Sequence, residues 1–233
     1  MFFFNPTYLL FMAPALLLVW LAKMRVDGAY RKWSQIPNSL RLRGADAAQR
    51  LLRYAGLSDV RLEAVPGQLT DHYDPRQNIL RLSEGVGYSA SVASLAIAAH
   101  EIGHAMQDRD GYGPLKFRSA IVPAVNIGSN LGWFLIFIGL ILRIVEVSWL
   151  GVLFFAAGAV FALITLPVEF NASKRAMVLL TETGVITSPE EGRGVKAVLD
   201  AAALTYVAGL AAALSQLLYY VFLLSGMGGR RRN

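Results

Sequence analysis

Five consecutive residues, His100-Glu101-Ile102-Gly103-His104, place two histidines and a glutamate at a spacing suited to hydrolytic chemistry. The chain has only 3 histidines, and a random sequence of this composition would show the H-E-x-x-H pattern about once in a thousand cases. On a helix, His100 and His104 share one face and can bind one metal ion, while Glu101 stands beside it as a base. Imidazole and carboxylate ligands in such a set favour zinc.

The third ligand must come from elsewhere in the chain, because catalytic zinc sites use three protein ligands and leave a fourth position to water. The chain contains no cysteine, so a histidine or a carboxylate is needed. Glu169 is the favoured candidate, since two apolar stretches separate it from His104 and an even number of membrane crossings returns the chain to the same side. It follows Pro167 and is predicted to begin a new helix, whose Ala172 and Ala176 leave room for the histidine helix.

Alternatives remain open for this third position. His72, the only other histidine, lies in the turn-like segment 71–75, where a solvated loop residue is the favoured interpretation. Asp74 in the same segment is a further fallback ligand. Glu169, taken without the H-E-x-x-H pattern, would be interpreted as an interfacial acid paired with Lys174 or Arg175.

The composition is that of a membrane protein, with 55% hydrophobic residues, 16% charged residues and a mean hydropathy of +0.46. Four stretches are long and apolar enough to cross a bilayer. They are residues 2–22, about 121–142, 149–166 and 201–224. No charged side chain precedes the first stretch, and Lys23 and Arg25 follow it, which favours a retained anchor over a cleaved signal peptide.

The predicted organisation alternates membrane and polar segments. It comprises an anchor helix at 1–22, an α+β portion at 23–120, a transmembrane hairpin at 121–166, a helix with the third ligand at 167–200, a membrane helix at 201–224 and a flexible basic tail at 225–233. Within the α+β portion, we expect helices at 45–54 and about 89–107, strands at 60–65 and 78–83, and turns between the strands. The second of these helices carries the H-E-x-x-H residues and is expected to begin at a cap, Ser89 or Ser91.

The chain resembles the YugP-type family of neutral zinc metallopeptidases of bacterial membranes. The resemblance covers nearly the whole chain and is carried by DHYDP at 71–75, LRLS at 80–83, AAHEIGHA at 98–105, PVEFNAS at 167–173 and LTY at 204–206. More remotely, the arrangement is similar to that of HtpX-type and Ste24-type membrane proteases, gluzincins in which a metal-binding glutamate opens a later helix. Those families place an aspartate four residues after that glutamate, where this chain has Ser173. We therefore expect a mainly α integral membrane protein with about four transmembrane helices and a small α+β gluzincin-like catalytic portion.

The expected activity is hydrolysis of peptide bonds in membrane or membrane-associated proteins. Zinc held by His100, His104 and Glu169 would activate water and polarise the scissile carbonyl. Glu101 would take the proton of that water and pass it to the leaving amine. Tyr206 is the candidate donor to the oxyanion, with a buried tyrosine bonded to a neighbouring helix as the competing interpretation. The predicted strand 78–83 is the candidate for pairing with an extended substrate.

The distribution of charge predicts where the protein resides. Its net charge of +6 is concentrated beside apolar segments, which indicates membrane topology and argues against nucleic acid as a partner. We expect a multi-pass protein of the bacterial cell membrane whose catalytic residues face the cytoplasm, with a protein or peptide substrate and the lipid bilayer as partners. The oligomeric state is left open. The alternative function is a non-proteolytic membrane scaffold or chaperone with a structural zinc site.

Overall fold

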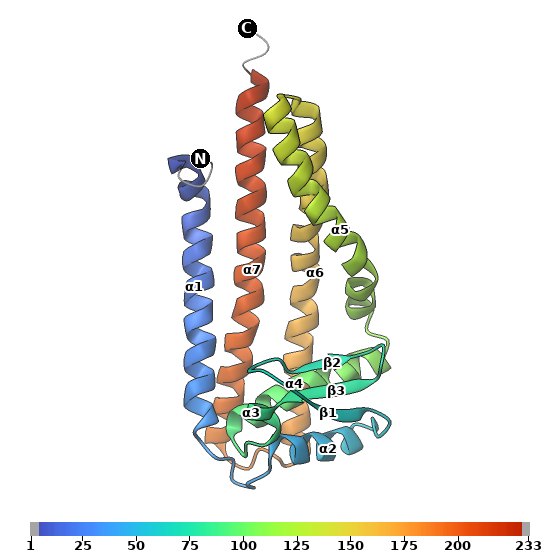
Figure 1. Ribbon diagram of the computed structural model, residues 1–233. Helices are drawn as coiled ribbons and strands as arrows, with labels where there is room; N and C mark the ends of the chain where they lie inside the picture. The colour runs from blue at the N-terminus through green and yellow to red at the C-terminus, as the bar shows by residue number, and fades with distance from the viewer. Residues whose placement is uncertain (1–4, 230–233) are drawn as a thin grey trace. The chain divides into compact units, whose positions relative to one another are not determined.

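The computed structural model describes residues 5–229, and helices dominate this part of the chain (Figure 1). The helices are α1 (Pro6–Ser34), α2 (Gly44–Tyr54), α3 (Glu84–Gly87), α4 (Val92–Arg109), α5 (Gly113–Leu142), α6 (Val145–Glu182) and α7 (Pro189–Gly229). The strands are β1 (Arg61–Val65), β2 (His72–Asp74) and β3 (Ile79–Ser83). The predicted fold class, mainly α with a small α+β portion, is confirmed.

Four helices, α1, α5, α6 and α7, are long and apolar enough to cross a membrane. Each extends beyond the span predicted for it. The prediction that Glu169 begins a new helix was wrong, because α6 continues through Pro167, which lies inside it. Proline removes one backbone hydrogen bond and often ends a helix, but here the residues that follow it, Val168 and Glu169, are buried and hold the next turn in place.

The C-terminal segment also differs from the prediction of a flexible tail from residue 225 onward. The helix α7 continues to Gly229. The three arginines of the predicted tail, at positions 230–232, lie outside the described residues.

The chain divides into two compact units. The apolar helical unit contains the chain up to Ala22, the segment Phe117–Leu166 and the chain from Thr205. The mixed unit contains Lys23–Lys116 and Pro167–Leu204. All five residues of the H-E-x-x-H pattern and Glu169 belong to the mixed unit, whereas Tyr206 belongs to the apolar helical unit.

Within the apolar helical unit, glycines bring α5 and α6 into close contact (Figure 1). A Cβ added to Gly132 would lie 2.6 Å from the backbone nitrogen of Phe155, and one added to Gly151 would lie 2.6 Å from the carbonyl oxygen of Gly132. Small residues at a helix interface allow this approach in an apolar environment, where packing replaces the hydrophobic effect.

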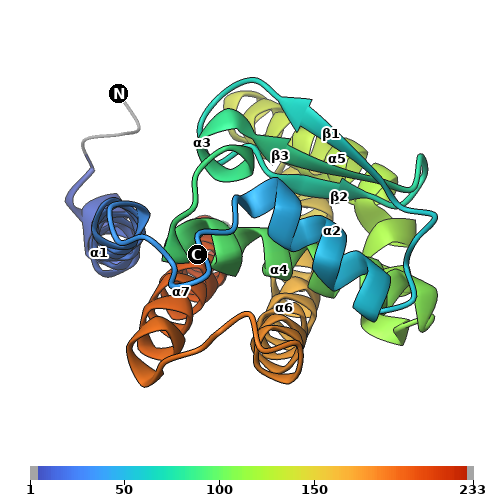
Figure 2. The same cartoon turned by 90° about the horizontal axis from the view of Figure 1, so that it is seen from below.

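The sheet of the mixed unit has the strand order β1-β3-β2, with β1 parallel and β2 antiparallel to β3 (Figure 2). The prediction of two strands was incomplete, because His72–Asp74, expected to be a turn, forms β2. The strand β3 therefore has neighbours on both sides. This position corrects the expectation that residues 78–83 could pair with a substrate, since an added strand needs a free edge.

A single hydrophobic core joins the elements of the mixed unit. Leu51 of α2, Leu80 of β3, Leu95 and Ile102 of α4, and Leu180 of α6 are all fully buried in it. Burial of each such side chain contributes about 1.5–3 kcal/mol to folding. The core consequently fixes α4 against the sheet on one side and against α6 on another.

Candidate metal site and catalytic residues

The helix α4 carries the H-E-x-x-H residues in the interior of the mixed unit. It begins after Ser91, whose hydroxyl accepts a hydrogen bond from the backbone nitrogen of Ser94 at 3.1 Å. Of the two predicted caps, Ser91 is thus the one used. The residues before His100 are small or apolar and almost all buried, so the helix is enclosed. Enclosure leaves the two histidines and Glu101 only partly exposed.

The helix α6 lies against α4 at the level of the histidines. A Cβ added to Gly103 would stand 2.5 Å from the backbone oxygen of Ala172, so no larger residue fits between the helices. Ala172 and Ala176 are fully buried, as expected from their position on the face of Glu169. Small residues at these three positions bring Glu169 within reach of the α4 side chains.

Three potential ligand atoms meet at this contact. One nitrogen each of His100 and His104 and one carboxylate oxygen of Glu169 lie within 4.8 Å of one another. The Glu169 Oε2 atom is 3.3 Å from His100 Nε2 and 3.6 Å from His104 Nε2. Two ligands bound tetrahedrally to one zinc ion at its usual bond lengths are about 3.3 Å apart. The donor types fit zinc, and so do the two separations between Glu169 and the histidines.

The second ring nitrogens of the two histidines have partners of their own. Ser173 Oγ lies 3.2 Å from His100 Nδ1, and Gln107 Oε1 lies 3.1 Å from His104 Nδ1. Contacts of this kind orient metal-binding histidines and leave Nε2 directed at the metal. Ser173 occupies the position at which the more remote families have an aspartate. Gln107 was missed, although its spacing of three residues from His104 on one helix was a usable signal.

Their surroundings shift the pKa values of Glu169 and Glu101 in opposite directions. Burial alone would raise the pKa of Glu169, but hydrogen bonds with His100 and His104 outweigh burial and hold the pKa well below its usual range. Glu169 therefore remains a carboxylate, the form that binds cations. Burial raises the pKa of Glu101 despite the two nearby histidines. A raised pKa is typical of a carboxylate that accepts and returns a proton.

Glu101 also contacts the sheet. Its Oε2 atom accepts a hydrogen bond of 3.1 Å from the backbone nitrogen of Tyr73 in β2. The Tyr73 hydroxyl lies 3.0 Å from Asn78 Oδ1 and 3.1 Å from Asp108 Oδ2, which holds β2 against α4. The edge strand of the sheet thus runs directly beside the proposed base.

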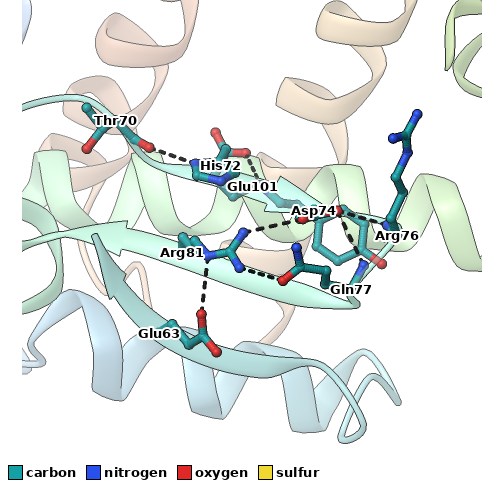
Figure 3. A network of polar contacts seen from close by, with 9 residues as sticks. Glu63, Thr70, His72, Asp74, Arg76, Gln77, Arg81 and Glu101 are labelled. Carbon is teal, nitrogen blue, oxygen red and sulfur yellow. Dashed lines mark hydrogen bonds and ion pairs between the residues drawn. The ribbon is translucent and has the colours of Figure 1, made fainter. Parts of the chain in front are cut away.

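The alternative ligands take no part in this cluster. His72 is exposed, and its Nδ1 lies 2.8 Å from the carbonyl oxygen of Thr70. Asp74 forms an ion pair of 3.3 Å with Arg81, whose guanidinium also reaches Glu63 (Figure 3). These contacts join the three strands across one face of the sheet. The Asp74 carboxylate therefore stabilises the sheet and does not contribute to the ligand cluster.

Tyr206 lies half-buried in α7. It belongs to the unit that does not contain the histidines. Its role as an oxyanion donor stays a prediction.

Comparisons with known proteins agree with this chemistry. A family model described as "Putative neutral zinc metallopeptidase" matches residues 8–225. The chain belongs to this family. It is also 43% identical over 212 residues to "Putative membrane protease YugP" of Bacillus subtilis (strain 168). The matched residues make up 91% of this chain and 93% of that protein. No solved structure matches the chain.

Family membership confirms the resemblance drawn from the sequence and the choice of zinc as cofactor. The four apolar helices and the membrane protease relative agree on a bacterial membrane protein. Membership of a metallopeptidase family also implies that the substrate is a protein or a peptide.

Proposed function

We propose that this protein is an integral-membrane zinc endopeptidase in which His100, His104 and Glu169 bind zinc and Glu101 is the general base. The observation that carries the proposal is the convergence of three ligand atoms within 4.8 Å on two packed helices, with Glu101 on the same helix turn. Three protein ligands leave one position of a tetrahedral site open, which is typical of catalytic and not structural zinc.

The metal and Glu101 have different roles in hydrolysis. Zinc, when bound, lowers the pKa of water and polarises the scissile carbonyl. Glu101 accepts the proton of the attacking water and delivers it to the leaving amine, so that peptide cleavage requires no other titrating group. The Tyr73 backbone N–H holds the Glu101 carboxylate in place through its 3.1 Å hydrogen bond, which limits the rotamers open to this side chain.

An extended substrate lies along the outer edge of β2, where Glu101 already accepts the hydrogen bond of the Tyr73 N–H. Unlike β3, β2 has a strand on one side only, and the Tyr73 N–H points away from β3 towards Glu101. An extended peptide beside this edge would pass close to the base and to the ligand cluster. Backbone hydrogen bonds in such pairing are independent of side-chain sequence, which suits cleavage of varied segments of membrane-associated proteins.

The mixed unit, we infer, is cytoplasmic. Basic residues of α1 follow its apolar stretch directly, at Lys23, Arg25, Arg31 and Lys32. Lys174 and Arg175 follow the apolar stretch of α6 in the same way. Both groups then obey the positive-inside rule with the N-terminus outside.

A single substitution tests the catalytic proposal. Purified Glu101→Gln protein in detergent should bind about one zinc per chain, as wild type does, and fail to cleave a fluorescently labelled unstructured protein such as casein. Glu84→Gln, at an exposed position outside the cluster, is the matched control and should cleave normally. Cleavage by Glu101→Gln at the wild-type rate would refute the mechanism and favour the scaffold function.

A further inference from the structure

Gln107 is a polar side chain that α4 buries completely. Its amide makes contacts at both ends. The Oε1 atom lies 3.1 Å from His104 Nδ1. The Nε2 atom donates to the backbone oxygen of Val168 at 2.8 Å and to Asn171 Oδ1 at 2.9 Å. Val168 directly precedes Glu169, so this one amide joins a candidate ligand on α4 to the segment of α6 that carries another.

The partners of Gln107 determine which end of the amide faces the histidine. A backbone carbonyl oxygen can only accept, so the atom facing Val168 must be the amide nitrogen. Asn171 Oδ1 is likewise an acceptor, because it also receives a hydrogen bond from Arg175 Nε at 2.9 Å. Reversing the amide would set two oxygens 2.8 Å apart at Val168. The Oε1 atom therefore faces His104.

An acceptor facing Nδ1 requires a proton on that nitrogen. In a neutral imidazole the other nitrogen, Nε2, then carries the free lone pair. His104 Nε2 is the atom that lies 3.6 Å from Glu169 Oε2 in the ligand cluster. His100 lacks this constraint, because its partner Ser173 has a hydroxyl that can donate or accept.

We propose that Gln107 is a positioning residue that holds His104 in the Nδ1–H tautomer and so presents Nε2 to zinc. The inference rests on the proposed role of His104 as a ligand. Loss of such a partner of a metal-binding histidine typically lowers metal affinity about 10–100-fold. Loss of the amide should lower zinc affinity more than a purely structural substitution would, because the amide links two of the three candidate ligands.

Zinc affinity and the histidine tautomer test the inference together. Competition with a zinc chelator in detergent should show zinc binding by Gln107→Met weakened about 10–100-fold, because methionine fills a similar volume without polar atoms. The matched control Gln49→Met, at an exposed position of α2, should bind zinc as wild type does. Nuclear magnetic resonance of zinc-loaded wild type labelled with ¹⁵N-histidine should show a proton on His104 Nδ1 and zinc on Nε2. This second measurement can overturn the inference even where Gln107→Met does not fold, because zinc on His104 Nδ1 would contradict it.

Unchanged affinity in folded Gln107→Met, or zinc on His104 Nδ1, overturns the inference. A His104→Ala variant separates this failure from that of the proposed function. If His104→Ala loses zinc but Gln107→Met does not, only the role of Gln107 is wrong. If His104→Ala binds zinc as wild type does, both the ligand set and the role of Gln107 are wrong.

Discussion

The backbone oxygen of Ala172 occupies the space that any side chain at Gly103 would need, because a Cβ added there would lie 2.5 Å from it. The glycine inside the H-E-x-x-H pattern thus sets the distance between α4 and α6. That distance in turn sets how closely Glu169 approaches His100 and His104. This one contact therefore affects both the packing of the two helices and the geometry of the candidate metal site.

Gly103→Ala should therefore weaken zinc binding as well as folding. The added methyl group forces the helices apart, at a cost of about 1–3 kcal/mol for overpacking, and moves Glu169 away from the histidines. We expect a lower melting temperature and a zinc affinity reduced at least about 10-fold, measured by thermal denaturation and chelator competition. Gly28→Ala, where an added Cβ meets nothing within 4 Å, is the matched control. Wild-type zinc affinity in folded Gly103→Ala would show that the helix spacing does not control the site.

Glu169→Ala should strip zinc from the protein or weaken its binding, because only two strong ligands remain. Metal analysis of the purified variant gives the stoichiometry, with about one zinc per chain expected for wild type. Glu182→Ala removes an exposed glutamate from the same helix and should leave zinc in place. If Glu169→Ala retained full zinc, His72 and Asp74 would return as candidate ligands despite their positions in the sheet region.

The sequence predicts much of this site because its determinants are local. The spacing of His100 and His104 and the small residues Ala172 and Ala176 follow helical periodicity, which a sequence displays directly. The length of apolar stretches likewise predicts the membrane helices. None of these features depends on a partner distant in the chain.

What escaped prediction depends on tertiary contacts. Residues 72–74 have the Asp and Pro neighbours of a turn, and they form β2 because β3 pairs with them and Tyr73 reaches Asp108 of α4. The central place of β3 follows from this pairing and not from its own residues. Helix α6 continues through Pro167, although proline often ends a helix, and the buried residues Val168 and Glu169 hold the turn that follows.

Tyr206→Phe tests the proposed oxyanion donor, whose position the sequence alone suggested. Loss of a donor used only in the transition state should lower kcat about 100–1000-fold with little change in KM. Zinc content should remain that of wild type. Tyr54→Phe, at an exposed position of the mixed unit, is the control. An unaltered kcat for Tyr206→Phe would leave Tyr206 as a structural residue of α7.

The surroundings of Glu191 predict how the stability of the folded protein depends on pH. Glu191 is buried, and its carboxylate accepts hydrogen bonds from the backbone nitrogens of Ser39 at 2.6 Å and Thr187 at 2.8 Å. It also forms a capping box with Ser188 at the start of α7, ahead of the apolar stretch from residue 201. Burial alone would raise its pKa, but these hydrogen bonds outweigh burial and lower the pKa of Glu191 to about 2 from its ordinary 4.5.

A pKa lowered by folding contributes stability above the unfolded value of 4.5 that is lost as the pH falls towards about 2. Each unit of such a shift corresponds to about 1.4 kcal/mol, so up to about 3 kcal/mol depends on this carboxylate. Thermal denaturation in detergent between pH 7 and pH 2 should show Glu191→Gln less stable than wild type at pH 7, with a smaller decline on acidification. Glu190→Gln alters the exposed neighbour and should follow the wild-type curve. Parallel curves for wild type and Glu191→Gln would mean that other carboxylates control acid unfolding.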